Sequence, residues 1–101
     1  LSQYETLGAR LGSANCKKGL GRVHLKLKKY DDASQCLEAA CDLYQSIGER
    51  FGEAHSYRYL GDLQKESGSN DAANQHYNKA EAIFSELGDT IRVNEVSRLK
   101  V

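Results

Sequence analysis

Three cysteines and three histidines are the side chains of this 101-residue chain best suited to chemistry, and their spacing argues against a reactive centre. Cys36 and Cys41 lie five residues apart in a helical pattern, about 140° around the axis, so they do not converge on a tetrahedral zinc ion. His24, His55 and His76 fall on three different helical segments, and none has a carboxylate or cysteine at a spacing that by itself indicates a catalytic triad. We therefore expect no enzyme activity, no metal and no cofactor.

Cysteine usage and charge balance indicate the general class of protein. Three cysteines cannot all pair, and their helical positions predict reduced packing residues in a cytoplasmic protein. Lys and Arg total 14, as do Asp and Glu, so no overall field draws the chain to nucleic acid or to an anionic membrane. No apolar run reaches the ~20 residues that a membrane span needs. Any preference for a charged partner must therefore be local.

One local basic pattern stands out. Lys18, Arg22 and Lys26 are spaced four and four, which places them on one face of a helix. A guanidinium can bind a carboxylate at two points, so the pattern favours an acidic ligand. The alternative interpretation is a solvated helix face, because surface charge is common and contributes little energy.

The sequence that surrounds these residues repeats with a period of 40 residues. The segment Tyr4-Glu5-Thr6-Leu7-Gly8 recurs at residues 44–48 as Tyr-Gln-Ser-Ile-Gly and at residues 84–88 as Phe-Ser-Glu-Leu-Gly. A period of this size is typical of a stack of repeated units, in which each unit buries its apolar side against the next. We expect the chain to be a section of a longer array.

Apolar spacing between these marks is helical. Steps of three and four residues predict full helices over about 10–28, 32–47, 50–67 and 71–87, with half-helices over about 1–7 and 90–100. One apolar stripe runs through Phe51, Ala54, Tyr57, Leu60 and Leu63, which we expect to face the core. Each unit is thus a first helix, a turn and a second helix, which we call helix A and helix B.

Turn chemistry supports these boundaries. Gly8, Gly48 and Gly88 each stand where a helix B is expected to end in a left-handed residue, and an acid at 49 or 89 then begins a helix A. Gly68 is expected to make the turn inside the second unit, with Ser69 or Asn70 as the N-cap. In the first unit the turn lacks glycine, and we expect Asp31 to be the cap.

The pattern resembles the tetratricopeptide repeat, and the resemblance covers the whole chain. It is carried by Tyr57, Leu60-Gly61, Ala73, Tyr77 and Ala80, and again by Leu20-Gly21, Ala33, Leu37 and Ala40. The 40-residue period, and glycine after helix B, look like the longer variant found in cell-polarity adaptors and in STAND or NACHT signalling proteins. The resemblance implies an all-α fold of helix-turn-helix repeats stacked in a right-handed superhelix.

On this basis residues 1–101 form a single repeat domain. Residues 1–8 are expected to end a preceding helix B, residues 9–48 and 49–88 to form the first and second repeats, and residues 89–101 to form a partial helix A or a cap.

In this family helix A lines a concave groove that holds a peptide or a segment of a partner protein. Projected onto this chain, the predicted peptide-binding residues are Asn15, Lys18, Arg22, Leu25, Lys26, His55, Arg58, Asp62 and Lys65. The basic members are expected to pair with ligand carboxylates, and Asn15 and His55 to select by hydrogen bonding. We expect a protein scaffold whose partner is acidic.

Two other functions stay open. Apolar ends, with Tyr4, Leu7 and Leu11 on one side and Ile91, Val93, Val96 and Leu99 on the other, would let copies associate, as in an oligomerisation or sensor region of a larger signalling protein. RNA binding is disfavoured, because the basic run at Lys26, Lys28 and Lys29 has no stacking aromatic residues and is followed by acids at 31 and 32.

Overall fold

A computed structural model describes residues 3–101, with side chains from residue 6 onward, and this part of the chain forms five helices and no strand. The helices are α1 (Gln3–Lys26), α2 (Tyr30–Ser46), α3 (Arg50–Glu66), α4 (Asn70–Glu86) and α5 (Thr90–Leu99). The expected all-α fold is confirmed.

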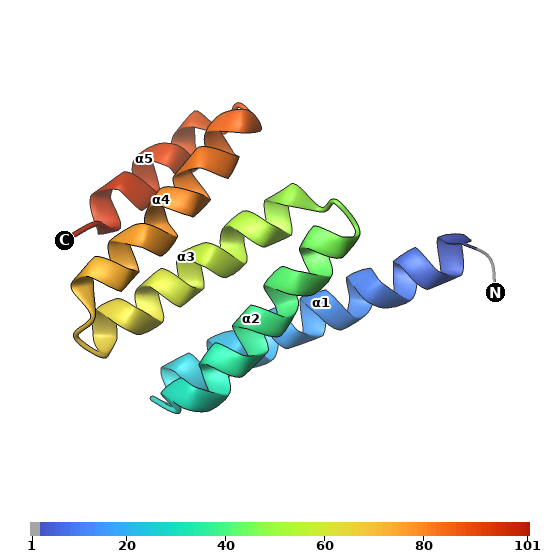
Figure 1. Ribbon diagram of the computed structural model, residues 1–101, viewed down its shortest axis with the longest axis horizontal. Coiled ribbons are helices and arrows are strands. Elements are labelled where there is room, and N and C mark those ends of the chain that lie inside the picture. The colour runs from blue at the N-terminus through green and yellow to red at the C-terminus, as the bar shows by residue number, and fades with distance from the viewer. Residues whose placement is uncertain (1–2) are drawn as a thin grey trace.

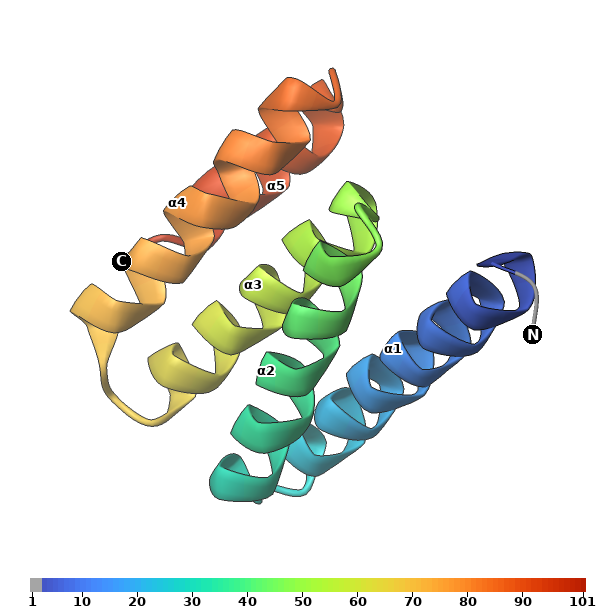
Figure 2. The same cartoon turned by 45° about the vertical axis from the view of Figure 1, so that its right-hand side comes forward.

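The helices form two layers. In Figure 1, α5 lies behind α4 and α1 passes behind α2, and Figure 2 shows the same arrangement from a second direction. Each helix packs mainly on the helices next to it in sequence, with a smaller contact between α1 and α3. Helices α1, α3 and α5 are therefore the A helices, and α2 and α4 are the B helices. None of the described helices is both long and apolar enough to cross a membrane.

The predicted break at Gly8 is wrong, because α1 runs without interruption from Gln3 to Lys26. Before Gly48 and Gly88, the buried rings of Tyr44 and Phe84 hold the end of helix B against a neighbouring helix. Residues 6–13 are all exposed, so little burial offsets the backbone hydrogen bonds that a turn at Gly8 would break. The first turns of α1 project beyond the rest of the molecule (Figure 1). The side chain of Tyr4, the counterpart of Tyr44, lies outside the described residues.

Four turns join the helices, and all four use the same backbone hydrogen bond. The N–H of residues 29, 49, 69 and 89 donates to the carbonyl five residues earlier, at 2.8–2.9 Å. The residue before each donor has positive φ, which is Gly48, Gly68 or Gly88 in three turns and Lys28 (φ 60°) in the other. A lysine in this left-handed region carries a steric cost that glycine avoids. The first turn therefore has the geometry of the others without the residue that suits it.

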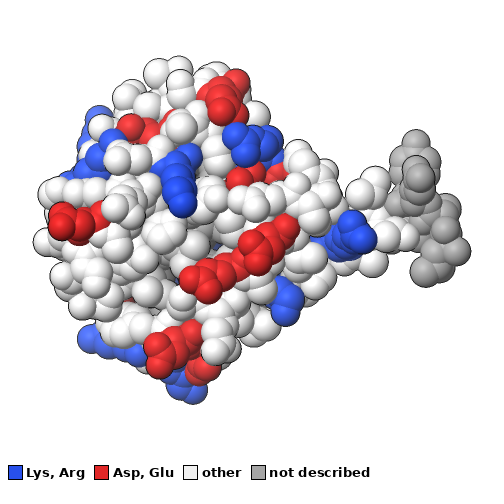
Figure 3. All heavy atoms as spheres, in the orientation of Figure 1, with Lys and Arg blue, Asp and Glu red and all other residues white. Residues whose placement is uncertain are grey.

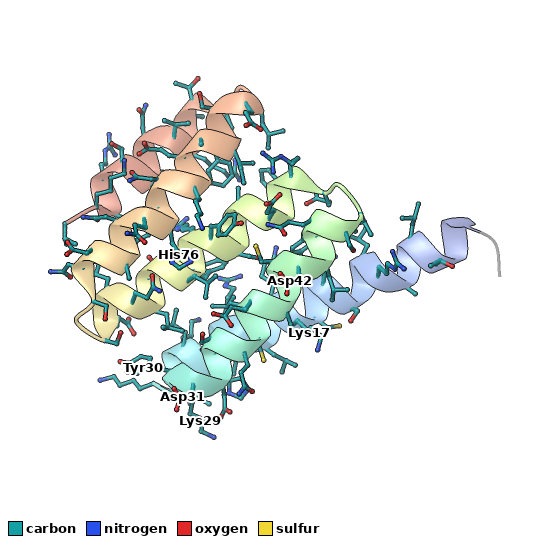
Figure 4. The ribbon with its side chains drawn as sticks, viewed as in Figure 1. Lys17, Lys29, Tyr30, Asp31, Asp42 and His76 are labelled. Atoms are coloured by element: carbon teal, nitrogen blue, oxygen red, sulfur yellow. The ribbon has the colours of Figure 1, made fainter. Side chains whose placement is uncertain are left out.

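Helix N-termini partly match the expectation. The side chains of Glu49 and Asp89 cap α3 and α5 by accepting the backbone N–H of Gly52 and of Arg92 respectively. Asp31 is not the cap of α2, since Lys29 occupies that position without a side-chain hydrogen bond. Figure 4 shows Asp31 beside Lys29 at the turn into α2. From the first turn of the helix, its carboxylate still interacts favourably with the helix dipole.

Glycines let each helix pair approach closely, as the repeat at Gly21 and Gly61 predicts. A Cβ atom added at Gly61 would lie 2.6 Å from Cε1 of Tyr77, and one added at Gly21 would lie 2.6 Å from Cγ of Leu37. Carbon atoms pack at about 3.5–4.0 Å, so neither position has room for a side chain. Tyr77 and Leu37 are both fully buried in the core.

The apolar C-terminal end is mostly used internally, which corrects the expectation of an open face there. Val96 is 1% exposed and joins Ile83 and Phe84 in one core cluster, with Val93 and Leu99 packed against it. Only Ile91 of that set is strongly exposed, at 72%. Residues 89–101 therefore act as a helix that covers α4.

Candidate ligand-binding face

The three A helices lie side by side and form one face of the molecule. The guanidinium of Arg22 in α1 lies over the ring of Tyr59 in α3, and Lys65 Nζ in α3 donates to the Leu99 carbonyl of α5 at 2.9 Å. We call the side-chain surface of α1, α3 and α5 the A face. It is turned away from the viewer in Figure 1, where α1 and α5 pass behind α2 and α4.

Three rings run along the middle of the A face. Phe51, His55 and Tyr59 are spaced four residues apart on α3, which places them on one side of the helix. Ring centroids are 4.6 Å apart for Phe51 and His55 and 6.3 Å apart for His55 and Tyr59. The buried ring of Phe84 lies 5.2 Å from the His55 centroid and supports the row. We call Phe51, His55 and Tyr59 the aromatic strip.

Only one member of the aromatic strip was predicted as a site residue. Phe51 was expected in the core but is 40% exposed, and Tyr59 was not selected at all. The spacing of four could have found both, but it also fits a core stripe. Which side of α3 faces the core is decided by the fit of Gly52 against Tyr44 and of Gly61 against Tyr77.

Cations cover the strip from both neighbouring helices. The Arg22 guanidinium lies 4.9 Å from the Tyr59 centroid, and the Arg92 guanidinium of α5 lies 4.8 Å from the Phe51 centroid. Arg58 lies 5.9 Å from Tyr59. Such contacts contribute about 0.5–1 kcal/mol at exposed sites, which is enough to orient an arginine side chain. Arg92, which sequence reasoning missed, thus joins the predicted Arg22 and Arg58.

His55 sits at the centre of this positive field. Burial, followed by the charges of Lys18, Arg92, Arg58 and Arg22 in that order, lowers its pKa from 6.5 to about 4. The imidazole is therefore neutral at pH 7. Four cations that come from three helices consequently act on one half-buried ring.

The other predicted selector is already engaged within the protein. Asn15 is exposed, but its side-chain carbonyl accepts a hydrogen bond from the Tyr44 hydroxyl. Lys18 lies beside this pair, 5.7 Å from the Tyr44 centroid, and its pKa is lowered by burial and then by Arg22. Both residues lie next to the strip on the α1 side.

The remaining predicted residues gather at the far end of the A face. Leu25, Lys26, Asp62 and Lys65 line an open hollow of about 510 Å³ together with Glu66. Three of them already have partners in the fold. Leu25 packs on a core cluster, Asp62 accepts the Tyr77 hydroxyl, and Lys65 binds the Leu99 carbonyl. Lys26 is the exposed cation of this group.

Acidic groups near the strip are mostly held by their own helices. The Glu49 carboxylate caps α3, and the Asp89 carboxylate accepts both the N–H and, at 2.8 Å, the guanidinium of Arg92. Glu95 lies 4.0 Å from Arg58. In the opposite layer, α2 carries Asp and Glu side chains but no Lys or Arg, and Lys79 is the one Lys or Arg of α4 (Figure 3).

The reactive residue types remain dispersed. His76 is held by Gln64, with Nδ1 2.6 Å from the amide oxygen, and Figure 4 shows it on α4 facing α3. Burial raises the pKa of the Cys41 thiol, which lowers its thiolate fraction at neutral pH. Within residues 3–101, no three His, Cys, Asp or Glu side chains gather in a way that could hold a metal ion.

Comparison with known proteins adds the family. The family model of the tetratricopeptide repeat matches residues 12–86, which include α2, α3, α4 and most of α1. No curated protein and no solved structure matches the chain at a significant level.

Proposed function

Because the chain belongs to the tetratricopeptide repeat family, whose repeats generally mediate protein–protein interactions, we propose that it is a scaffold module whose A face binds an acidic segment of a partner protein. One observation carries the proposal: Lys18, Arg22, Arg58 and Arg92 act together on the ring of His55 from three A helices. A ligand with negative charge would meet this field as it approaches.

The cations on the α1 side are the most available to a ligand. Of the side chains described from residue 6 onward, Lys18 and Arg22 take part in no ion pair within 4.0 Å. Arg58 has only a long contact, 4.0 Å, to the half-exposed carboxylate of Glu95. A ligand carboxylate could therefore approach Arg22 without displacing an internal carboxylate, and guanidinium groups bind carboxylates with two parallel hydrogen bonds.

The test is charge reversal on the A face. Arg22→Glu combined with Arg58→Glu should weaken binding of an acidic peptide by more than tenfold, which corresponds to about 1.4 kcal/mol. Fluorescence anisotropy with a labelled acidic peptide measures the affinity at two salt concentrations, because the attraction is expected to fall with screening.

A matched control reverses two charges away from the A face. Lys29→Glu combined with Lys79→Glu changes the net charge equally, with Lys29 at the α1–α2 turn and Lys79 over the ring of Tyr57. Circular dichroism checks that both double variants keep their helices. Equal affinity of the two variants for the acidic peptide would contradict a role for the A face.

A second function, association of two copies, is favoured by the outer surface of α1. On α3, Gly52, Ser56, Leu60 and Leu63 are buried where α3 packs on α2. Their counterparts 40 residues earlier on α1 are Gly12, Cys16, Leu20 and Val23, and all four are exposed. Leu20 and Val23 are each 52% exposed, so this surface lacks the helix that its counterpart has.

We propose a second copy as its occupant, and light scattering over a wide concentration range tests this. The chain is expected to dimerise with rising concentration, and Leu20→Glu should keep it monomeric because a charge would have to be buried. A wild-type chain that stays monomeric at every concentration would rule this second function out.

A further inference from the structure

The aromatic strip has the spacing of an extended peptide. Its rings are four residues apart on a helix that rises 1.5 Å per residue, so ring attachment points are separated by about 6 Å. In an extended chain, side chains on one face are two residues apart, about 6.6–6.8 Å. Three successive ligand side chains on one face therefore match the attachment points of Phe51, His55 and Tyr59 to within about 1–2 Å over the whole strip. Their ends must converge by about a further 1 Å, because the ring centroids are only 4.6 Å and 6.3 Å apart.

The three positions along the strip differ in chemistry. At one end the Arg22 guanidinium covers Tyr59, and at the other end the Arg92 guanidinium covers Phe51. The ring of His55, between these two ends, contacts the rings of Phe51, Tyr59 and Phe84. The strip thus has a guanidinium at each end, with that of Arg92 paired to the Asp89 carboxylate at 2.8 Å, and an uncharged ring between them.

Electrostatics supports the same division. The His55 imidazole is neutral at pH 7, since burial and the surrounding cations hold its pKa at about 4. A ligand carboxylate placed directly on this ring would lose hydration without gaining a charged hydrogen-bond donor from the ring. A flat apolar side chain at that place would gain an aromatic contact.

We propose, resting on the proposed function, that the A face recognises an extended segment with an aromatic residue flanked at two residues' distance on each side by an acidic residue. One acid pairs with Arg22, the other shares the Arg92 guanidinium with Asp89, and the aromatic side chain packs on His55. The pattern acid–x–aromatic–x–acid reads the same in both chain directions, so it holds for either orientation of the ligand along α3.

Peptides of equal charge separate this proposal from general acid binding. The core sequence Glu-Ser-Phe-Ser-Glu carries the pattern, and Glu-Ser-Glu-Ser-Phe has the same composition with the spacing broken. The first should bind about tenfold more tightly than the second. A third peptide, Glu-Ser-Ser-Ser-Glu, keeps the acids and removes the ring, and it should bind at least severalfold more weakly than the first.

Variants assign the positions. His55→Asn places on α3 the residue type found at the counterpart position 15, and it should abolish the preference for the phenylalanine peptide over Glu-Ser-Ser-Ser-Glu. Arg92→Gln should weaken the binding of both Glu-Ser-Phe-Ser-Glu and Glu-Ser-Ser-Ser-Glu. Lys79→Gln is the matched control, because Lys79 also lies over a ring, that of Tyr57 at 5.4 Å, but on α4. It should leave all affinities unchanged.

The outcomes are distinct. Equal affinity for the two peptides of equal composition overturns the spacing rule and leaves the acidic-ligand proposal standing, provided that the Arg22 and Arg58 reversals still weaken binding. Failure of all acidic peptides to bind overturns both proposals. A ten-nucleotide oligothymidylate is measured at the same salt concentration, since rings and cations in one groove also suit single-stranded nucleic acid. Tighter binding of that oligonucleotide than of the peptides would overturn the peptide assignment.

Discussion

Both repeats place a large side chain of helix B against a glycine of helix A, but they complete that contact differently. In the second repeat, Tyr77 packs on Gly61 and its hydroxyl donates to Asp62. In the first repeat, Leu37 packs on Gly21 and has no hydroxyl to donate, and the position that corresponds to Asp62 is Arg22. The guanidinium of Arg22 instead lies on the A face over Tyr59.

A second pair of positions shows the opposite exchange. In the first repeat, the Tyr44 hydroxyl donates to Asn15. In the second repeat the counterparts are Phe84 and His55, which meet through their rings. Each repeat therefore commits one A-face position to an internal hydrogen bond, and the other position makes a ring contact instead. The choice between a hydroxylated and an unhydroxylated core side chain decides which position is hydrogen-bonded.

Removing the large helix B side chain that packs on each glycine is expected to have the largest effect on stability. Tyr77→Ala should destabilise the fold by about 4 kcal/mol, and Leu37→Ala by about 3 kcal/mol. The tyrosine variant costs more because it removes a larger buried side chain and leaves Asp62 without its donor. Urea unfolding followed by circular dichroism measures both. A greater loss in Leu37→Ala would show that the two contacts are not ranked by volume and hydrogen bonding.

Substitution of alanine for glycine at two corresponding positions should change the free energy of unfolding in opposite directions. A Cβ at Gly52 would overlap Cε1 of Tyr44, whereas a Cβ at Gly12 would meet no described atom within 4 Å beyond the backbone of its own helix. Gly52→Ala should therefore destabilise by about 1–2 kcal/mol, because overpacking exceeds the gain in helix propensity. Gly12→Ala should stabilise by up to ~1 kcal/mol through helix propensity alone. Thermal and urea unfolding of the two single variants provide the measurement, and matching signs would contradict the exposed placement of this surface of α1.

The turns between A and B helices give a smaller effect. Lys28 has φ 60° in the first repeat, and its counterpart Gly68 has φ 89° in the second. Lys28→Gly should stabilise by about 0.5–1 kcal/mol, since strain in the folded state exceeds the added freedom of the unfolded chain. Gly68→Ala should destabilise by a similar amount. The midpoint of urea unfolding reports both, and a destabilised Lys28→Gly variant would mean that the lysine is not strained.

His55 should make the stability of the fold depend on pH, whereas its counterpart Asn15 carries no titratable group. The folded-state pKa of His55, about 4, lies below the usual 6.5, so the unfolded chain binds more protons between these values. The contribution of neutral His55 to the free energy of unfolding is fully present above pH 6.5 and should fall as the pH drops towards 4. His55→Asn should make this decline shallower in urea unfolding at pH 7.5, 6 and 5. His76, whose pKa burial also lowers, contributes to the decline that remains.

Sequence reasoning gives the fold and the helix order because apolar spacing and glycine turns are local signals. It fails at Gly8, where the local signal for a turn is present but the helix continues and the described side chains of residues 6–13 are all exposed. It also fails at Asp31, since the N-cap is set by the hydrogen bond from Lys29 to the His24 carbonyl at the end of α1. Local chemistry predicts an element only where the surroundings agree with it.

The candidate site is predicted less completely, because a side chain's direction depends on packing. The spacing of four places Lys18 and Arg22 on one face correctly, and both border the aromatic strip. Phe51 and Tyr59 carry the same apolar and aromatic character as core residues, so the sequence cannot separate them from the core stripe. Arg92 is recognisable only once α5 is placed beside α3, where its guanidinium meets Phe51.

Packing of each helix mainly on its sequence neighbours has a consequence for the order in which the chain opens. In such a stack, unfolding can begin at either end without disturbing the middle. Amide protons in the exposed residues 6–13 of α1 and in the ten-residue α5 should exchange fastest, and those of α3, held between α2 and α4, slowest. A ligand that joins Arg22 on α1 to Arg92 on α5 across α3 would fasten both loose ends to the slowest-opening helix, and would thereby turn a fraying stack into one cooperative unit.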